Sequence, residues 1–329
     1  MKKIAINGFG RIGRASLKVI MDTPDLEIVA VNDLLTIENA AYLLKYDSVY
    51  GIYNKEVSAN GDHLLVGDKK IQYLSAKDPA QLPWKQLQID VVIESTGIFT
   101  NREDAEKHIH AGAKHVVISG PTKSLDTPTV VHGVNTADGK VAIFSCASCT
   151  TNNISPLIEI MGRRIGIKKA ILNTTHAYTA SQSLVDGPSK KKPRMGRAAA
   201  MNLVPASTGA AIATIKTLPQ YKGKFDGIAV RTPVVVGSIS DVTFLAERPT
   251  SAEEINSILK EEAATDRYKK VICFSEQPLV STDIIQSTFA TIVDSEMTRV
   301  VDGDLCKIMA WYDNEWGFTN QMIRQIVEI

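Results

Sequence analysis

The sequence predicts an α/β protein of two domains, the first built on a mostly parallel sheet and the second on a mixed or antiparallel sheet. Three observations support this prediction. The chain has 329 residues, roughly twice the length of a typical domain. Its first half alternates short apolar runs with helical periodicity, and its second half contains longer strands in which apolar and polar residues alternate. We place the boundaries so that residues 1–148 form the first domain and residues 149–313 the second.

Composition points to an ordinary globular protein. Hydrophobic residues make up 44% of the chain and charged residues 22%, with a net charge of +1. This balance gives no overall attraction to nucleic acid or to anionic membranes. The apolar run before Gly8 has four residues and is too short for a signal peptide. We therefore expect a soluble, cytoplasmic protein without membrane contacts.

Cysteine usage favours a reactive thiol over a structural role. The four cysteines are too few for a disulfide framework in a chain of this length. Cys146 and Cys149 form a C-x-x-C pair, but a zinc site needs two further ligands and no second C-x-x-C exists. We expect no metal, and a single catalytic cysteine fits an intracellular enzyme better.

The elements of the first half follow an alternating order. Their strands are nearly continuous apolar runs, which is typical of a parallel sheet covered by helices. In chain order we predict a strand at 3–7, a helix at 11–21, a strand at 26–32, a helix at 36–45, hairpin turns at 60–61 and 67–68, a strand at 90–94, a helix at 102–110 and strands at 115–119 and 141–145.

The second half contains longer strands with alternating side chains, which favour a sheet with helices on one face. We predict these strands at 171–178, 225–231, 238–247, 286–294 and 305–312. The last segment has apolar residues at helical spacing, including Phe318, Met322 and Ile326. We expect residues 314–329 to form a C-terminal helix that returns to the first domain.

A glycine motif follows the first predicted strand and opens the first predicted helix. Gly8, Gly10 and Gly13 match G-x-G-x-x-G in that context, which is typical of a Rossmann-type dinucleotide site. Gly8 permits the tight turn, Gly10 lets the backbone approach a pyrophosphate, and Gly13 allows close packing of helix and strand. Asp33 ends the second strand, where a carboxylate accepts from a ribose 2′-hydroxyl and repels a 2′-phosphate. The cofactor is therefore predicted to be NAD.

Cys149 lies in the segment SCASCTTNN after a predicted strand. A helix starting there would favour the thiolate, because its free N–H groups stabilise negative charge. Pro156 leaves open whether the helix begins nearer Ser155 or kinks there. His176 is either a packed core residue or the acid–base partner of a thiol.

Five segments carry a resemblance to a known family. INGFGRIGR, ASCTTN, HAYTASQ, RAAAMNLVPASTGAA and WYDNEWG occur in this order along essentially the whole chain. Together they resemble the phosphorylating glyceraldehyde-3-phosphate dehydrogenases. The resemblance implies an NAD-binding first domain, a catalytic second domain and a homotetramer in glycolysis or gluconeogenesis.

The resemblance also implies a reaction. Cys149 would attack the aldehyde of glyceraldehyde 3-phosphate, and His176 would take the proton and stabilise the oxyanion. Transfer of hydride to NAD would leave a thioester, which inorganic phosphate would convert into 1,3-bisphosphoglycerate.

Other site residues are implied by the same resemblance. Asn314 would hold the nicotinamide carboxamide, and hydroxyls, backbone N–H groups and a guanidinium would bind phosphates. The implied cofactor positions are Gly8, Gly10, Arg11, Ile12, Gly13, Asp33, Lys77, Thr96, Ser119 and Asn314. The substrate phosphate would bind Thr179 and Arg231, and the attacking phosphate would bind Ser148, Thr150, Thr208 and Gly209.

Some readings stay open. Cys146, Asn153, Phe318 and the run TPVVVGS after Arg231 depart from the family pattern. Cys146 either fills a buried space or forms a reversible disulfide with Cys149. The basic segment 186–197 is either a loop that bridges subunits or a nucleic-acid patch. The alternatives to the triose enzyme are an erythrose-4-phosphate dehydrogenase, which needs no phosphate, and a non-catalytic RNA-binding or scaffold protein.

Overall fold

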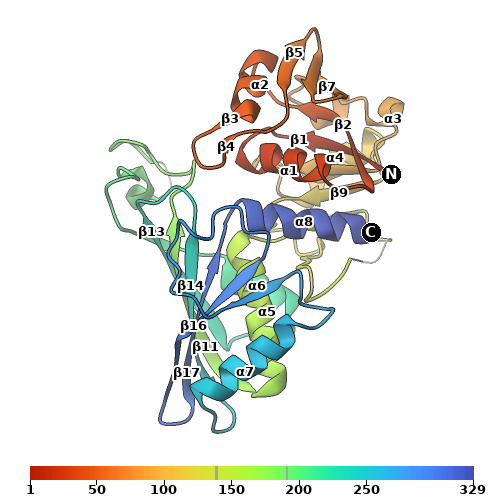
Figure 1. The fold of residues 1–329 in the computed structure, drawn as a ribbon. Helices are drawn as coiled ribbons and strands as arrows, with labels where there is room; N and C mark the ends of the chain where they lie inside the picture. Colours follow the sequence, from red (N-terminus) through yellow and green to blue (C-terminus); the bar gives the residue numbers. More distant parts are fainter. Residues whose placement is uncertain (138–139, 190–191) are drawn as a thin grey trace. The chain divides into compact units, whose positions relative to one another are not determined.

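The structure, a computed structural model, describes residues 1–137, 140–189 and 192–329 (Figure 1). The chain divides into two compact units. Unit 1 comprises Met1–Val130, Thr136–Ala147 and Met322–Ile329, and unit 2 comprises Val131–Asn135 and Ser148–Gln321. The main segment of unit 2 begins at Ser148, whereas we placed the start of the second domain at residue 149.

Unit 1 is built on an eight-stranded sheet in the order β10-β9-β8-β1-β2-β7-β6-β5. The pairs from β10 to β7 are parallel, and β6 and β5 add an antiparallel hairpin edge, so the predicted parallel sheet is confirmed. Both faces of β1 are covered, since Ile4, Ala5 and Ile6 are fully buried. The strands are β1 (Lys2–Asn7), β2 (Leu26–Asn32), β5 (Val57–Asn60), β6 (His63–Val66), β7 (Lys69–Leu74), β8 (Val91–Glu94), β9 (His115–Ile118) and β10 (Ile143–Ser145).

Two helices of unit 1, α2 and α4, begin at polar caps. Thr36 accepts a hydrogen bond from the backbone of Asn39, and Asn101 accepts one from Asp104, which satisfies N–H groups of the first turns. At the C-terminus, Lys2 Nζ donates to the carbonyl of Val327 and so neutralises a helix end. The elements between the strands are α1 (Arg11–Met21), α2 (Ile37–Lys45), the hairpin β3 (Tyr46–Asp47) and β4 (Gly51–Ile52), α3 (Trp84–Leu87) and α4 (Arg102–His110).

Unit 2 is built on a seven-stranded mixed sheet in the order β12-β13-β11-β14-β17-β16-β15. The pairs β11/β13 and β15/β16 are parallel and the others are antiparallel, as the sequence predicts. The strands are β11 (Ile167–Ala177), β12 (Val204–Ser207), β13 (Phe225–Thr232), β14 (Ser238–Ala246), β15 (Ile272–Ser275), β16 (Thr291–Val301) and β17 (Leu305–Tyr312).

One predicted strand is wrong in its limits. The strand expected at 286–294 begins only at Thr291 and runs on to Val301. Gln286 has a φ of 65°, a left-handed conformation that no strand continues through. Its backbone N–H donates to the Asp313 carboxylate instead of to a neighbouring strand. Gln286 therefore belongs to a turn that precedes the strand.

Helices cover one face of the sheet in unit 2 (Figure 1). Leu172, Val242, Phe244 and Ile308 of the sheet pack there against Leu157 of α5 in one buried cluster. The helices are α5 (Cys149–Arg164), α6 (Ala210–Thr217), α7 (Ala252–Ala263) and α8 (Trp316–Glu328), of which α8 ends in unit 1. The sequence did not predict α6 or α7.

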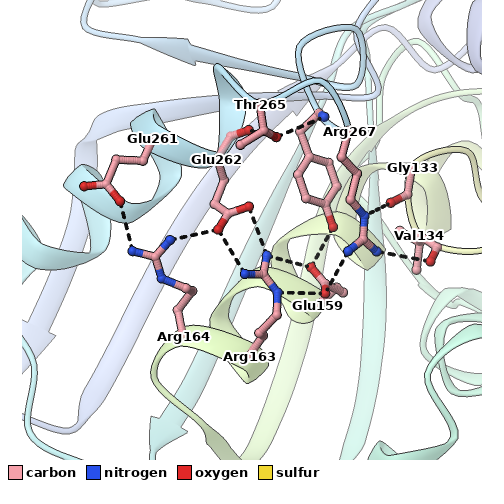
Figure 2. A network of polar contacts seen from close by, with 10 residues as sticks. Gly133, Val134, Glu159, Arg163, Arg164, Glu261, Glu262, Thr265 and Arg267 are labelled. Carbon is pink, nitrogen blue, oxygen red and sulfur yellow. Dashed lines mark hydrogen bonds and ion pairs between the residues drawn. The ribbon is translucent and has the colours of Figure 1, made fainter.

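A charged network joins the helices at the surface of unit 2 (Figure 2). Arg163 of α5 donates to Glu159 on its own helix at 3.0 Å and to Glu262 of α7 at 2.9 Å. Arg267 donates to the carbonyl of Gly133 at 2.6 Å. The network therefore fixes α5 against α7 and attaches the short segment 131–135 to them.

Candidate active site

The nucleophile candidate opens a helix. Helix α5 begins at Cys149, and the hydroxyl of Ser148 caps it by accepting the N–H of Thr151 at 3.0 Å. Pro156 lies inside the helix, where it removes only one hydrogen bond to the Asn152 carbonyl. The alternative start near Ser155 is therefore wrong, and the Cys149 sulfur lies at the positive end of the helix dipole.

Strand pairing brings the acid–base candidate to the thiol. His176 lies near the end of β11, and its Nε2 is 3.4 Å from Cys149 Sγ. The parallel register pairs His176 with Arg231 on β13, so these two side chains come from adjacent strands. Three residues that the sequence singled out from separate segments are thus in contact.

The second nitrogen of His176 has two neighbours with opposite roles. Nδ1 is 2.7 Å from the carbonyl of Ala177 and 2.6 Å from Arg231 Nη1. When Nδ1 carries the proton it donates to Ala177, and Nε2 is then the acceptor that faces the thiol. When Nδ1 is unprotonated it accepts from Arg231, and Nε2 then carries the proton. The surroundings therefore accommodate both neutral tautomers of the ring, one with Nε2 as an acceptor and one with Nε2 as a donor.

Burial and charge set the protonation of this group. Burial, and next the positive charge of Arg231, lower the pKa of His176 to about 4. The imidazole is therefore neutral at pH 7 and able to accept a proton. Burial raises the pKa of the Cys149 thiol, and the charge of Arg231 and hydrogen bonds from Thr150 oppose that rise. The arrangement suits a thiol that loses its proton to His176 as it attacks a substrate.

Tyr312 is a site residue that sequence reasoning missed. Its hydroxyl is 2.9 Å from the hydroxyl of Thr150 and 2.8 Å from that of Thr174, and it is fully buried. Its ring meets His176 edge-on at a centroid distance of 6.0 Å. Tyr312 therefore connects α5, β11 and β17 beside the Cys149–His176 pair. The signal was its position inside the motif WYDNEWG.

The predicted phosphate positions lie in different settings of unit 2. Ser148 caps α5, and Thr150 is buried against Tyr312. Thr179 Oγ1 is 2.9 Å from the hydroxyl of Ser181. Thr208 accepts the N–H of Ala210 as α6 begins, next to the exposed Gly209. Hydrogen bonds link only Arg231 directly to His176, so the phosphate roles of the others stay predictions.

The glycine turn of unit 1 has the shape that a dinucleotide needs. Gly8 has a φ of 96°, and a side chain there would lie 2.5 Å from the backbone of Thr96. A Cβ at Gly13 would lie 2.1 Å from the Gly8 carbonyl, so helix and strand pack without a gap. A Cβ at Gly10 would meet nothing within 4 Å, and no side chain caps the N-terminus of α1. This open helix end fits a pyrophosphate.

The carboxylate of Asp33 is oriented by that turn. It accepts the N–H of Phe9 at 2.5 Å and that of Leu35 at 2.9 Å, and these bonds hold it beside the glycines. Arg11 pairs with Asp47 at 2.5 Å. The remaining predicted cofactor positions in unit 1 are the partly buried Ile12, Thr96 and Ser119 and the exposed Lys77.

Asn314 belongs to unit 2, where its orientation is fixed. Its side-chain oxygen accepts hydrogen bonds from the backbone of Gly237 and from the hydroxyl of Ser238, both at 3.1 Å. These two bonds determine which way the amide NH₂ group points. The position suits a donor to a carboxamide, and that role remains a prediction.

Cys146, the other cysteine of the C-x-x-C pair, lies in a different setting from Cys149. Cys146 is almost fully buried, and burial raises the pKa of its thiol, which favours packing over reactivity. Within residues 1–137, 140–189 and 192–329, no three His, Cys, Asp or Glu side chains are grouped to hold a metal ion. No helix in that part of the chain is long and apolar enough to span a bilayer.

Comparisons with known proteins agree with this geometry. Residues 2–102 match the family model described as glyceraldehyde 3-phosphate dehydrogenase, NAD binding domain, and residues 148–314 match its C-terminal domain. The chain is 45% identical to glyceraldehyde-3-phosphate dehydrogenase of Zymomonas mobilis over 98% of its length and 96% of that protein. It is 44% identical to the enzyme of Geobacillus stearothermophilus and 46% identical to that of Thermotoga maritima, again over 98% of the chain and 96% and 97% of those proteins. With its glycine turn, its capped cysteine and these matches, the chain belongs to the glyceraldehyde 3-phosphate dehydrogenase family.

Proposed function

We propose that the protein oxidises D-glyceraldehyde 3-phosphate with NAD and transfers the acyl group to inorganic phosphate, giving 1,3-bisphosphoglycerate. The observation that carries this proposal is the contact of Cys149 with His176, at 3.4 Å, with Arg231 against the same ring. A thiol, a neutral base and a cation in one partly buried place suit acyl chemistry on an anionic aldehyde.

The residues of this chain act in sequence. His176 Nε2 accepts the thiol proton while Cys149 Sγ bonds to the aldehyde carbon and forms a thiohemiacetal. NAD, when bound, supplies the oxidation that converts this adduct into a thioester. His176 stabilises the oxyanion by donating a hydrogen bond from Nε2. Attack of phosphate on the thioester carbon then breaks the C–S bond and releases the acyl phosphate, and the Cys149 thiolate takes back the proton that His176 accepted.

Two anion sites serve the two phosphates in this scheme. Arg231 and Thr179 bind the phosphate of the substrate, because a guanidinium and a hydroxyl both donate to phosphate oxygens. Ser148, Thr150, Thr208 and Gly209 hold the attacking phosphate. Two helices begin at or beside these residues, α5 after Ser148 and α6 after Gly209. Helix N-termini favour anions, which supports the second assignment.

Steady-state assays test the reaction and separate it from the erythrose-4-phosphate alternative. We expect NAD reduction with glyceraldehyde 3-phosphate to depend on added phosphate, and NAD to be preferred to NADP because of Asp33. Equal rates with and without phosphate, together with faster turnover of erythrose 4-phosphate, would favour the other enzyme. The Cys149→Ser variant is the control for background reduction.

The proposal also covers the oligomeric state of the protein and its location in the cell. We propose a cytoplasmic homotetramer that works in glycolysis or gluconeogenesis. The sheet of unit 2 supports the assembly, because its face opposite the helices carries the exposed apolar residues Ile171, Ile228, Val301 and Leu305. Such a patch is typical of a surface between subunits. Residues 190 and 191 of the predicted bridging loop lie outside the described residues.

A further inference from the structure

A cluster of polar side chains is buried in unit 1 beneath the dinucleotide turn. Glu94 ends β8 and is 2% exposed, and His108 of α4 is fully buried. Asn7 ends β1 and Asn32 ends β2, and both are buried as well. Trp84 completes this group, which we call the Glu94 cluster. Neither the catalytic scheme nor the predicted cofactor positions use these five residues.

The carboxylate of Glu94 receives four hydrogen bonds. Oε2 accepts from Asn7 Nδ2 at 2.5 Å and lies 3.1 Å from His108 Nε2. Oε1 accepts from the backbone N–H of Thr96 at 2.9 Å and from the hydroxyl of Thr96. Each oxygen therefore has two donors, which is the usual capacity of a carboxylate oxygen. Only a side chain whose two oxygens both accept hydrogen bonds, such as a carboxylate, fits among these four donors.

Trp84 fixes the role of His108. Its indole Nε1–H donates to His108 Nδ1 at 2.9 Å. An indole can only donate, so Nδ1 must accept and the ring proton must lie on Nε2. That proton faces Glu94. The indole thus ensures that His108 presents a donor to the carboxylate.

The cluster extends to three backbone segments near the predicted cofactor positions. On one side, Thr96 is held directly, and its backbone lies where a side chain at Gly8 would be. On the other side, Asn7 Oδ1 accepts from Asn32 Nδ2 at 2.7 Å. The Asn32 amide in turn donates to the Ala76 carbonyl at 3.0 Å and accepts the Ala76 N–H at 2.8 Å. Ala76 directly precedes Lys77.

We propose that Glu94 is a positioning residue for NAD, holding the glycine turn, the loop before Lys77 and the turn at Thr96 in one arrangement. The inference rests on NAD binding by unit 1. It differs from a purely structural role, because three of the four bonds of Glu94 go to Asn7, which directly precedes the glycine turn, and to Thr96, a predicted cofactor position. Both donors of Thr96 are used by Glu94, so Thr96 acts by shaping the turn.

Glu94→Gln tests this assignment with almost no change of size. The new NH₂ group must face either the two donors of Thr96 or those of Asn7 and His108, and His108 cannot change its tautomer while Trp84 donates to Nδ1. One side of the cluster is therefore released. We expect the Kd for NAD, measured by isothermal titration calorimetry on the full chain, to rise about tenfold, the effect of roughly one lost or misplaced hydrogen bond. The kcat at saturating NAD should change less than about threefold.

Glu262→Gln is the matched control. Glu262 is a carboxylate that is 6% exposed, and it accepts from Arg163 and Arg164 in the charged network of unit 2 (Figure 2). Its loss should lower the melting temperature and leave the Kd for NAD unchanged. If Glu262→Gln weakens NAD binding as much as Glu94→Gln, or if Glu94→Gln binds NAD as the wild type does, the positioning role is wrong.

Trp84→Phe gives an independent test that keeps an aromatic ring in place. Without the indole N–H, Nδ1 of His108 loses its partner and the ring is held less firmly against Glu94, so the Kd for NAD should rise about threefold, less than in Glu94→Gln. A wild-type Kd in this folded variant would overturn the proposal even if Glu94→Gln does not fold. Failure of the wild-type protein to bind NAD would overturn the dinucleotide site itself, and the wild-type titration detects that outcome separately.

Discussion

At the scale of single residues, opposing influences act on the pKa of Cys149, and burial, which raises it, outweighs the others. Burial disfavours its thiolate, while the N-terminus of α5 and the charge of Arg231 favour it. His176 is neutral under the same two influences, burial and Arg231. A resting pair of thiol and imidazole therefore becomes reactive only as the proton moves between them.

The first prediction concerns His176 as the base. His176→Asn keeps a polar side chain of similar reach but removes the group that accepts a proton near neutral pH. We expect kcat to fall by about 10²–10⁴-fold, the usual contribution of a general base, with a small change in the KM for the aldehyde. Stopped-flow measurement of NADH formation checks this. A variant that retains more than about a tenth of the wild-type rate would exclude His176 as the base.

The second prediction concerns Arg231 and pH. Removing a positive charge beside an imidazole stabilises its cationic form, so Arg231→Gln should raise the pKa of His176 from about 4. The same change removes a charge that favours the thiolate, so it should raise the pKa of Cys149 as well. The rise in the pKa of Cys149 moves the pH midpoint of its alkylation by iodoacetamide upward, because iodoacetamide reacts with the thiolate.

Arg163→Gln is the control for this experiment, because Arg163 belongs to the separate network of α5 and α7. Its midpoint should equal that of the wild type. An unchanged or lowered midpoint in Arg231→Gln would contradict the electrostatic coupling between Arg231 and the catalytic pair.

At the scale of elements, the glycine turn between β1 and α1 contains one glycine that packing requires and one that ligand binding requires. A Cβ at Gly13 would lie 2.1 Å from the Gly8 carbonyl, whereas a Cβ at Gly10 would meet nothing within 4 Å. Gly10 also has a φ of −70° and extended backbone, which alanine adopts without strain. Within this motif, packing therefore requires a glycine at residue 13, whereas the fold alone would tolerate a side chain at residue 10.

This difference gives the third prediction. Gly13→Ala should lower the free energy of unfolding by about 2–4 kcal/mol through overpacking. Gly10→Ala should change it by less than about 1 kcal/mol while raising the Kd for NAD, since the methyl group occupies the space of the pyrophosphate. Urea denaturation and calorimetric titration of both variants check this. Normal NAD binding by Gly10→Ala would place the pyrophosphate elsewhere.

Some helices and strands could be predicted from the sequence and others could not. Local signals sufficed for α1, α2 and the strands β1 and β2, because caps, glycines and apolar periodicity act over a few residues. The start of α5 was left open, since Pro156 gave a signal that competed with the cap at Ser148. The strand expected at 286–294 was wrong in its limits, because Gln286 lies in a turn before the strand and donates its N–H to Asp313, a partner distant in the sequence.

The sequence predicted which residues belong to the candidate site, but it did not predict how they are arranged in space. Motifs identified Cys149, His176 and Arg231, yet only the pairing of β11 with β13 and the start of α5 bring them together. Tyr312 and Glu94 were missed for a related reason. Each looks like an ordinary residue at a strand end, and its role depends on partners that are distant along the chain.

At the scale of the whole molecule, the proposed homotetramer needs a surface, and the open face of the sheet in unit 2 offers one. The fourth prediction is that light scattering after size exclusion gives the mass of four 35.8-kDa chains. Ile171→Asp combined with Ile228→Asp should reduce that mass, because both side chains are more than half exposed on this face and a charge there disfavours burial. An intact tetramer in the double variant would move the interface to another surface.

The central claim is that Cys149 carries the acyl group, and the fifth prediction tests it. With NAD and glyceraldehyde 3-phosphate but no inorganic phosphate, the enzyme should form about one NADH per chain and then stop, because the thioester has no acceptor. Mass spectrometry of the quenched protein should find the phosphoglyceroyl group on the peptide that contains Cys149. Continuous NADH formation without phosphate, or a burst with no acyl group on that peptide, would contradict this account.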